Sequence, residues 1–392
     1  MLHQMRQSSS NEYPFIDSQV ELIRFCRSLT DCDWIALDTE FLREKTYYPK
    51  LCLIQVAAGE HAACIDPIAL DDISPLLDII YDRNIIKVMH AARQDLEIFY
   101  HLMGKVPFPV FDTQIAATIL GHEPQIGYAS LVKKLLGVTL DKTHTRTNWQ
   151  QRPLSDQQRL YAINDVVYLM KIYIDIKASL AHKNREHWLK DDMEALSDSS
   201  LYENSPGDAW RRIRVANRLG TQQLEILQAL AAWREETASA KNIPRSWLCK
   251  DETLRELSRL QPLELEQLSQ IKGVTKGLVN NHGESLISII QKARHSAPTE
   301  SISPAFKRLE PQQIALVDTL MAIIYQCATD NAIGPTSLTT RKEIEKLVRG
   351  DRSIEILSGW RYELIGKQLL EMLAGNLNLR VLDGKVNILP TS

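Results

Sequence analysis

The chain has 392 residues, more than one hydrophobic core usually supports, and its 44% hydrophobic and 24% charged residues are typical of a globular protein. The formal net charge of −3 argues against a chain that is basic throughout. The six cysteines form no CxxC pair and no apolar run approaches about 18 residues, which speaks against a disulfide framework, a zinc site and a membrane span.

The amino-terminal part is expected to fold as an α/β domain over residues 11–183, after a polar, disordered stretch at 1–10 without the apolar core of a signal peptide. We therefore expect a cytoplasmic protein. Three consecutive strands are predicted first and suggest an antiparallel meander: Asp33–Phe41, Leu51–Ala57 and Ala62–Asp66.

Strands then alternate with helices, so the sheet is expected to become mixed. The predicted elements are a helix at Ser74–Tyr81, a strand at Ile85–His90, a helix at Ala91–Met103, a strand at Val110–Phe111 and a helix at Thr113–Leu120. Ser155 and Gln158 have the spacing of a capping box, which predicts a long helix ending near Ala181.

The remainder of the chain is expected to be helical. A polar linker is predicted at 184–207, with room for one short helix, followed by a helical bundle at 208–296. A second linker at 297–308 leads to another bundle at 309–378. The tail, 379–392, carries Asp383-Gly384 between alternating apolar residues, which is typical of a hairpin.

Asp38 and Glu40 stand two positions apart in the first predicted strand, so both carboxylates project from one face. Ile35, Ala36 and Leu37 precede them and indicate a buried strand, where carboxylates are costly without a cation or hydrogen-bond donors. Two readings stay open at this point: a divalent metal site, or a strand that emerges into solvent.

Two further acidic positions follow. Asp95 lies in the first turn of a helix that leaves an apolar strand, where it either joins a ligand set or balances the helix dipole. Tyr161 and Asp165 lie four positions apart, on one face of the long helix, and alone would be an ordinary exposed pair. Found in this order along one chain, the acidic residues and Tyr161 together favour a functional site over unrelated charges.

In that order the residues resemble the DEDD exonuclease superfamily, whose catalytic domain is a ribonuclease H-like mixed sheet with flanking helices. The matching segments are Asp38-Thr39-Glu40, Asp95 in HAARQDL, and Tyr161-Ala162-Ile163-Asn164-Asp165, which marks the tyrosine branch. The segments TYYPKLCLIQVA and VFDTQIAATIL are similar to the ribonuclease D family. The resemblance covers essentially the whole chain.

The resemblance implies a 3′→5′ exoribonuclease that uses two divalent cations, Mg²⁺ or Mn²⁺, and releases nucleoside 5′-monophosphates. It implies that Asp38 bridges both ions, that Glu40 and Asp165 complete the first, and that Asp95 supports the second. Tyr161 would orient the attacking water, because a phenol with an ordinary pKa near 10 is a weak base at neutral pH.

Four other residues near these motifs have less support. His90 precedes Asp95 in its motif, yet a structural histidine at a strand end is the favoured reading. Thr39, Phe41 and Gln114 are candidates for the substrate groove on sequence proximity alone.

The first helical module resembles an HRDC domain, through LEILQALAAWREETASAKNIP and LSQIKGV. Residues 210–294 contain 14 Lys and Arg against 9 Asp and Glu, so a basic module follows an acidic one. An ordinary solvated charge is the favoured reading for any single one of its basic residues, whereas substrate handling is favoured for the module as a whole. Its candidate phosphate contacts are Arg211, Arg212, Arg214, Arg218, Arg234, Lys272 and Lys276. The second bundle, with DNAIGPTSLTTRKEIEKLVRG, matches the HRDC family more weakly.

The expected partner is RNA with a single-stranded 3′ end, with precursors of tRNA as the family's substrates, and the protein is expected to be a monomer away from membranes. Two rival readings are a DNA 3′→5′ exonuclease acting in repair and a non-catalytic RNA-binding scaffold. Tyr161 in place of histidine counts against the first, and the complete acidic set counts against the second. No GxxxxGK[ST] loop is present to indicate a helicase.

Overall fold

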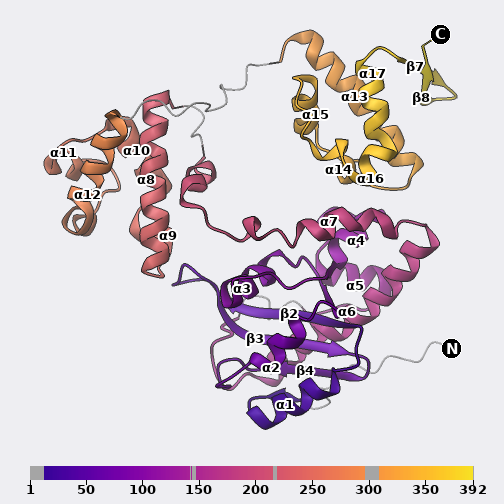
Figure 1. The fold of residues 1–392 in the computed structure, drawn as a ribbon, viewed down its shortest axis with the longest axis horizontal. Helices are drawn as coiled ribbons and strands as arrows, with labels where there is room; N and C mark the ends of the chain where they lie inside the picture. Colours follow the sequence, from indigo (N-terminus) through magenta and orange to yellow (C-terminus); the bar gives the residue numbers. More distant parts are fainter. Residues whose placement is uncertain (1–12, 142, 144–146, 215–218, 296–308, 392) are drawn as a thin grey trace. The chain divides into compact units, whose positions relative to one another are not determined.

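The structure is a computed structural model that describes residues 13–141, 143, 147–214, 219–295 and 309–391 (Figure 1). These residues form two compact units. The first contains residues 13–41, Leu51–Asp198 and 309–391, and the second contains Leu42–Lys50 and the described residues from 199 to 295. Each unit is thus assembled from segments that lie far apart in the sequence.

The first unit is built around a sheet with the strand order β1-β4-β3-β2-β5-β6 (Figure 1). β3 pairs with β4 in antiparallel fashion, whereas β1 is parallel to β4, and β5 is parallel to both β2 and β6. The predicted mixed sheet is therefore confirmed. The strands are β1 (Phe15–Ile16), β2 (Trp34–Leu42), β3 (Lys50–Ala58), β4 (His61–Ile65), β5 (Ile86–Met89) and β6 (Val110–Asp112).

Strand β2 lies inside the sheet, between β3 and β5. Ile35, Ala36 and Leu37 in its first half are completely buried, as expected for a strand that is covered on both faces. The second half changes character, because Asp38 and Glu40 are partly exposed while the intervening side chain is buried. The strand therefore carries its acidic residues from the core toward solvent.

The helices in the amino-terminal part of the first unit agree with the prediction to within two residues where one was made, and α1 and α5 have no counterpart among the predicted elements. Figure 1 shows α1 and α2 next to each other beside the sheet, where they are in contact. The helices are α1 (Gln19–Ser28), α2 (Ser74–Ile80), α3 (Arg93–Met103), α4 (Thr113–Ile119), α5 (Tyr128–Leu136), α6 (Asp156–His182) and α7 (Leu189–Ala195), with a 3-10 turn at Glu186–Trp188.

Helix α6 begins at the predicted capping box. The backbone N–H of Gln158 donates to Ser155 Oγ at 3.2 Å, and the Ser155 N–H donates back to Gln158 Oε1 at 2.9 Å. Farther along, the Tyr173 ring lies 4.6 Å from the ring of Trp34 and 4.9 Å from that of Phe111. These aromatic contacts hold the helix against β2 and β6.

The predicted linker at 184–207 differs from the structure over its first half. The one short helix expected there is α7, and its Leu189 and Met193 are buried in the same core cluster as α4, α5 and α6. Met193 Sδ also accepts the backbone N–H of Asp112 at 3.2 Å. The first unit accordingly extends to Asp198, because apolar side chains at helical spacing tie this segment to the domain.

The carboxy-terminal bundle belongs to the first unit and shares its core cluster. The rings of Trp188 and Trp360 stack at 4.4 Å, and Arg361 donates to both carboxylate oxygens of Asp192 at 2.9 and 3.2 Å. The elements are α13 (Pro311–Asp330), α14 (Pro335–Leu338), α15 (Arg341–Val348), a 3-10 turn (Glu355–Leu357), α16 (Gly359–Arg361), a π-helical turn (Tyr362–Gly366) and α17 (Lys367–Leu373).

The predicted hairpin is present at the end of the chain. β7 (Leu377–Leu382) and β8 (Lys385–Pro390) pair in antiparallel fashion. Asp383 and Gly384 form the two-residue turn between them, with φ of 49° and 73°, which is the backbone conformation that favours Asp-Gly in tight hairpins.

The second unit is helical, as predicted. Its elements are 3-10 turns at Ser199–Leu201 and Pro206–Arg212, α8 (Thr221–Ala240), α9 (Arg245–Leu248), α10 (Asp251–Leu260), α11 (Leu265–Ser269) and α12 (Lys276–His295). The connection Leu42–Lys50 between β2 and β3 also belongs here. The backbone N–H groups of Tyr47 and Tyr48 donate to Asn242 Oδ1 at 3.0 and 3.2 Å, which anchors it.

Three of the predictions concern residues that the structure does not describe. The disordered stretch at 1–10, the linker at 297–308 and the candidate phosphate contact Arg218 lie outside the described residues. Among the helices in the described ranges, none is both long and apolar enough to cross a bilayer.

Arg152 fastens the segment that precedes α6 to the sheet. Its guanidinium donates to Asp66 Oδ1 and to the carbonyl of Cys52, each at 2.7 Å, and the Asp66 side chain is 2% exposed. In Arg152→Leu the Asp66 carboxylate stays buried without its cation, so we expect the free energy of unfolding to fall by about 3–5 kcal/mol.

Urea denaturation followed by circular dichroism measures this loss. The matched control is Lys134→Ala, which removes an exposed ion pair with Glu123 and should cause no measurable loss. Equal stability of the Arg152→Leu variant and the wild type would contradict a structural role for the buried pair.

Candidate active site

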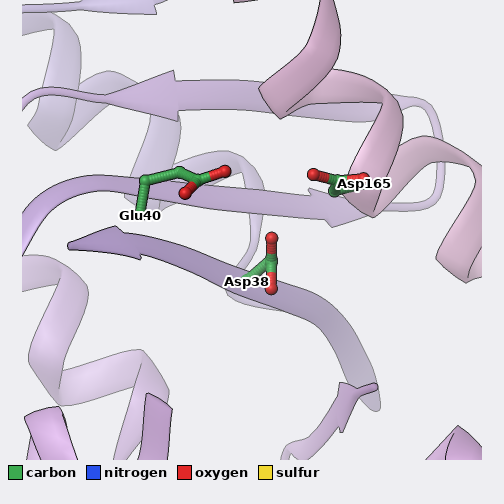
Figure 2. A group of neighbouring side chains, drawn as sticks. All are labelled: Asp38, Glu40 and Asp165. Carbon is green, nitrogen blue, oxygen red and sulfur yellow. The ribbon is translucent and has the colours of Figure 1, made fainter. Parts of the chain in front are cut away.

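Three carboxylates from distant parts of the sequence meet at the exposed half of β2. Asp38 and Glu40 come from β2 and Asp165 from the middle of α6, and Figure 2 shows their side chains pointing toward one another. Each offers one oxygen, and these oxygens all lie within 4.8 Å of one another. The structure thus brings together the first and third acidic motifs of the sequence.

The three groups repel one another's charge in surroundings poor in water. Loss of hydration raises the pKa of Glu40 to about 9, with Asp165 as the next contributor, and burial raises the pKa of Asp165 to about 8. Burial also raises the pKa of Asp38 well above its usual range, and the nearby charges of Asp95, Asp165 and Glu40 act in the same direction. A cation is therefore needed for all three to be ionised at neutral pH.

Asp95 lies next to this cluster and is not one of the three. It is 7% exposed and stands in the first turn of α3, and Thr39 Oγ1 donates a hydrogen bond to Asp95 Oδ1. Burial raises the pKa of Asp95 to about 7, while the bond from Thr39 opposes that shift. The hydrogen bond from Thr39 thus orients the carboxylate of Asp95. Thr39 was predicted only as a candidate for the substrate groove.

Tyr161 is partly buried one turn before Asp165 on α6, so the predicted spacing of phenol and carboxylate is present. Its ring centre lies 6.0 Å from that of Trp149, a residue that is 2% exposed. A fixed indole on one side restricts the orientation of the phenol.

Tyr128, in α5, is a positioning residue that sequence reasoning missed. Its hydroxyl lies 2.6 Å from the carbonyl oxygen of Asp165 and 3.1 Å from that of Asn164. Burial raises the pKa of Tyr128 well above its usual range, so the hydroxyl stays a donor. The contact fixes the backbone that carries Asp165, and only the tertiary fold reveals it, because no spacing rule links positions 128 and 165.

His90 has the structural surroundings favoured from the sequence. Its Nδ1 lies 3.0 Å from Thr113 Oγ1 and its Nε2 lies 3.0 Å from the carbonyl oxygen of Ile126, while burial lowers its pKa. Gln114 likewise donates from Nε2 to the Ile126 carbonyl at 3.0 Å, which uses this amide group within the fold. Phe41 is partly buried at the end of β2.

Asp112 is a buried acid that was not predicted as a site residue, and its contacts are structural. Its carboxylate accepts the backbone N–H groups of Ala91, Ala92 and Gln114 at 2.8–3.1 Å as the N-cap of α4. A carboxylate with several backbone donors needs no cation. The cluster around Asp38 is different, because carboxylates surround one another there.

Three oxygen ligands at this spacing suit a hard divalent cation. Mg²⁺ and Mn²⁺ prefer carboxylate and water oxygens, and Mg²⁺ keeps several waters, so a few protein ligands suffice. The raised pKa values describe the metal-free state, and a bound cation would favour the ionised forms. The arrangement can therefore bind divalent metal beside an opening to solvent.

The basic residues predicted to contact nucleic acid lie in the second unit and differ in their surroundings. Arg234 is 4% exposed and donates to Asp251 Oδ1 at 2.7 Å and to the carbonyl of Cys249 at 2.9 Å. It is a core residue, so the structure contradicts its prediction as a surface phosphate contact. The other described candidates, all exposed, are Arg211, Arg212, Arg214, Lys272 and Lys276.

Profiles of two known protein families match parts of the chain. A 3′-5′ exonuclease profile matches residues 13–181, the part that carries the carboxylate cluster, and an HRDC domain profile matches residues 223–290. One HRDC domain is therefore detected where the sequence analysis expected two.

Curated relatives and a solved structure are similar over nearly the full length. Ribonuclease D of Sphingobium indicum is 40% identical over 387 residues, covering 97% of this chain and 99% of the relative. Ribonuclease D of Zymomonas mobilis is 39% identical over 380 residues, covering 95% and 97%. The crystal structure of Escherichia coli RNase D superposes with a TM-score of 0.82 at 32% identity, covering 93% and 99%.

Metal binding should stabilise the folded protein more strongly at high pH. The pKa of Glu40 rises from 4.5 to about 9 on folding, and that of Asp165 from 3.8 to about 8. At a pH between the ordinary and the raised pKa of each group, the metal-free folded protein holds protons that the unfolded chain has released. The free energy of unfolding of the metal-free protein therefore falls as pH rises through this range. A divalent cation replaces those protons, and we expect Mn²⁺ to raise Tm more at pH 8 than at pH 6.

Differential scanning fluorimetry with and without Mn²⁺ measures the effect. Asp38→Asn should raise the Tm of the metal-free protein at pH 8 and abolish the response to Mn²⁺. Asp175→Asn, an exposed acid on the same helix as Asp165, is the matched control and should respond like wild type. An undiminished Mn²⁺ response in Asp38→Asn would place the metal elsewhere.

Proposed function

The chain belongs to the ribonuclease D family and is a 3′→5′ exoribonuclease, and from this premise we propose that the carboxylate cluster around Asp38 is its catalytic centre. The observation that supports the proposal is the convergence of Asp38, Glu40 and Asp165 to within 4.8 Å. The cluster lies within the region that matches the exonuclease profile.

The chain uses divalent metal, and we infer two ions, Mg²⁺ or Mn²⁺. Asp38, Glu40 and Asp165, whose oxygens lie within 4.8 Å of one another, would hold the metal: Asp38 would be shared by both ions, Glu40 and Asp165 would complete the ligands of one, and Asp95 would support the other. Two bound divalent ions supply a nucleophilic water at neutral pH and offset charge on the scissile phosphate and the leaving oxygen. Thr39 holds the Asp95 carboxylate in one orientation through its hydrogen bond.

Tyr161 is proposed to orient the attacking water. Its hydroxyl belongs to a ring packed near Trp149, and the same helix carries Asp165 one turn later. The phenol donates or accepts a hydrogen bond without becoming the main base, because its ordinary pKa is near 10. The product of each cycle is a nucleoside 5′-monophosphate, and the strand is shortened from its 3′ end.

The carboxy-terminal bundle is proposed to be a second, diverged HRDC domain. Helices α8 and α13 begin at 221 and 311 and end at 240 and 330, so each bound is shifted by 90 positions. The same shift relates the bounds of α9 and α14, and the starts of α10 and α15. The left-handed residues Asn242 and Ala332 are also 90 positions apart.

The substrate is RNA, and we propose precursors of tRNA with a single-stranded 3′ end. The exposed cations of the second unit, among them Arg212, Lys272 and Lys276, would contact phosphates without reading sequence. A monomer in the cytoplasm stays the expectation from the sequence.

Removal of the central carboxylate should separate binding from hydrolysis. In Asp38→Ala we expect loss of nuclease activity by at least about 10³-fold, because the shared metal ligand is gone, while the Kd for RNA stays within about twofold. Gel assays of a labelled oligoribonucleotide with Mg²⁺, together with fluorescence anisotropy, measure both quantities.

Asp175→Ala is the control for a lost acid on α6 and should be fully active. Retained hydrolysis by Asp38→Ala would defeat the site assignment.

Matched RNA and DNA oligomers should show faster digestion of RNA, and the opposite ranking would favour a DNA exonuclease.

Tyr161→Phe tests the orienting role. Loss of the hydroxyl leaves the ring beside Trp149 in place, so the fold should persist. We expect kcat to fall by roughly 10²-fold, the lower end of what a positioned proton-transfer group contributes, with KM unchanged. A variant with wild-type kcat under single-turnover conditions would remove Tyr161 from the catalytic set.

A further inference from the structure

The second unit contains a cavity of about 580 Å³ whose charge is mainly positive. Residues from the Leu42–Lys50 connection, the 3-10 turn Pro206–Arg212, α8 and the starts of α9 and α10 line it. The charged lining residues are Arg43, Arg212, Arg234, Arg245 and Lys250 against Glu235, Asp251 and Glu252. Cations thus exceed carboxylates, which favours an anionic ligand.

Internal ion pairs account for part of this charge. Arg234 is paired with Asp251, and Arg245 donates to both oxygens of Glu235 at 2.6 Å, with Arg212 in addition at 3.3 Å. Arg43 and Lys250 are exposed at the cavity. These two side chains are placed to meet a ligand that arrives from solvent.

Trp247 is an exposed aromatic residue next to this cavity in the sequence. It lies on α9, directly after the lining residues Arg245 and Ser246, and its exposed fraction is 62%. Indole rings are rarely so exposed, since each leaves a large apolar surface in water. Exposed aromatic rings beside cations are the arrangement by which proteins hold single-stranded nucleic acid, with bases stacked on the rings.

The fold itself does not require this exposure. The related helix in the carboxy-terminal bundle is α14, where Ser337 stands 90 positions after Trp247. Ser337 is 7% exposed and Leu338 is 1% exposed, so α14 packs against its surroundings. Of the two similar helices, α9 instead presents its tryptophan to solvent.

We propose that Trp247 and the cavity lined by the residues just before it in the sequence bind single-stranded RNA, with the indole stacked on a base and with Arg43 and Lys250 contacting backbone phosphates. The proposal rests on the exoribonuclease function. Neither contact reads the identity of a base, as an enzyme that shortens varied RNA ends requires.

Binding of a fluorescein-labelled 12-nucleotide oligoribonucleotide to the full chain, in the inactive Asp38→Ala background, tests the site. Trp247→Ala should raise Kd about tenfold, whereas Trp247→Tyr should stay within about twofold because a ring remains for stacking. Tyr325→Ala is the matched control, since Tyr325 is 54% exposed on α13 and has no part in the proposal. An unchanged Kd for Trp247→Ala, or an equal loss for Tyr325→Ala, overturns the proposal.

The phosphate contact has its own readout. Lys250→Ala should reduce the slope of log K against log salt by about 0.7, the value expected for one phosphate on a single strand. Lys342→Ala, an exposed lysine on α15, should leave the slope unchanged. Equal slopes for Lys250→Ala and the parent protein overturn the proposed phosphate contact.

Hydrolysis by chains with an intact Asp38 separates this inference from the proposed function. Trp247→Ala should raise KM for long oligomers with kcat unchanged, and turnover of a 5′-phosphorylated dinucleotide should equal that of wild type. If the wild-type chain hydrolyses RNA while Trp247→Ala has wild-type KM, the binding site alone is refuted. If the wild-type chain degrades no RNA, the proposed function is refuted as well.

Discussion

Three carboxylates lie close together at one partly buried site, and the fold has to hold them there. Asp38, Glu40 and Asp165 place their oxygens within 4.8 Å of one another, where burial raises all three pKa values and the charges of neighbouring carboxylates raise those of Asp38 and Glu40 further. Such a cluster tends to spread apart or to hold protons. The surrounding fold has to resist that tendency so that a cation, and not relaxation, relieves the repulsion.

Rigid elements provide this resistance. β2 lies between two neighbouring strands, and α6 is capped at Ser155 and packed through Tyr173 on the sheet. Tyr128 fixes the backbone at Asp165 from the side. Glu235 in the second unit shows the alternative solution for a buried acid. Burial opposes its ionisation, but hydrogen bonds from Arg245 and Tyr47 outweigh burial and lower its pKa. Glu235 is therefore kept ionised by neighbouring side chains of the protein, whereas the cluster of Asp38, Glu40 and Asp165 depends on a bound cation.

Much of this site could be predicted from local patterns. The two-residue spacing of Asp38 and Glu40 places both on one face of a strand, and the capping box located the start of the helix that carries Asp165. The partners of Asp95 could not be predicted, because its bond to Thr39 joins residues 56 positions apart. Arg234 was assigned to the surface by its charge alone, and its burial follows from pairing with Asp251, which periodicity does not reveal.

The two helical bundles differ in what their apolar residues pack against. The long helices α8 and α13 and the short helices α9 and α14 that follow them have the same spacing in the sequence. The apolar residues of the carboxy-terminal bundle nevertheless pack in the core of the first unit, where Trp360 stacks on Trp188. The domain in the second unit keeps a core of its own and binds the connection that follows the proposed ligand Glu40, through Asn242 and Glu235.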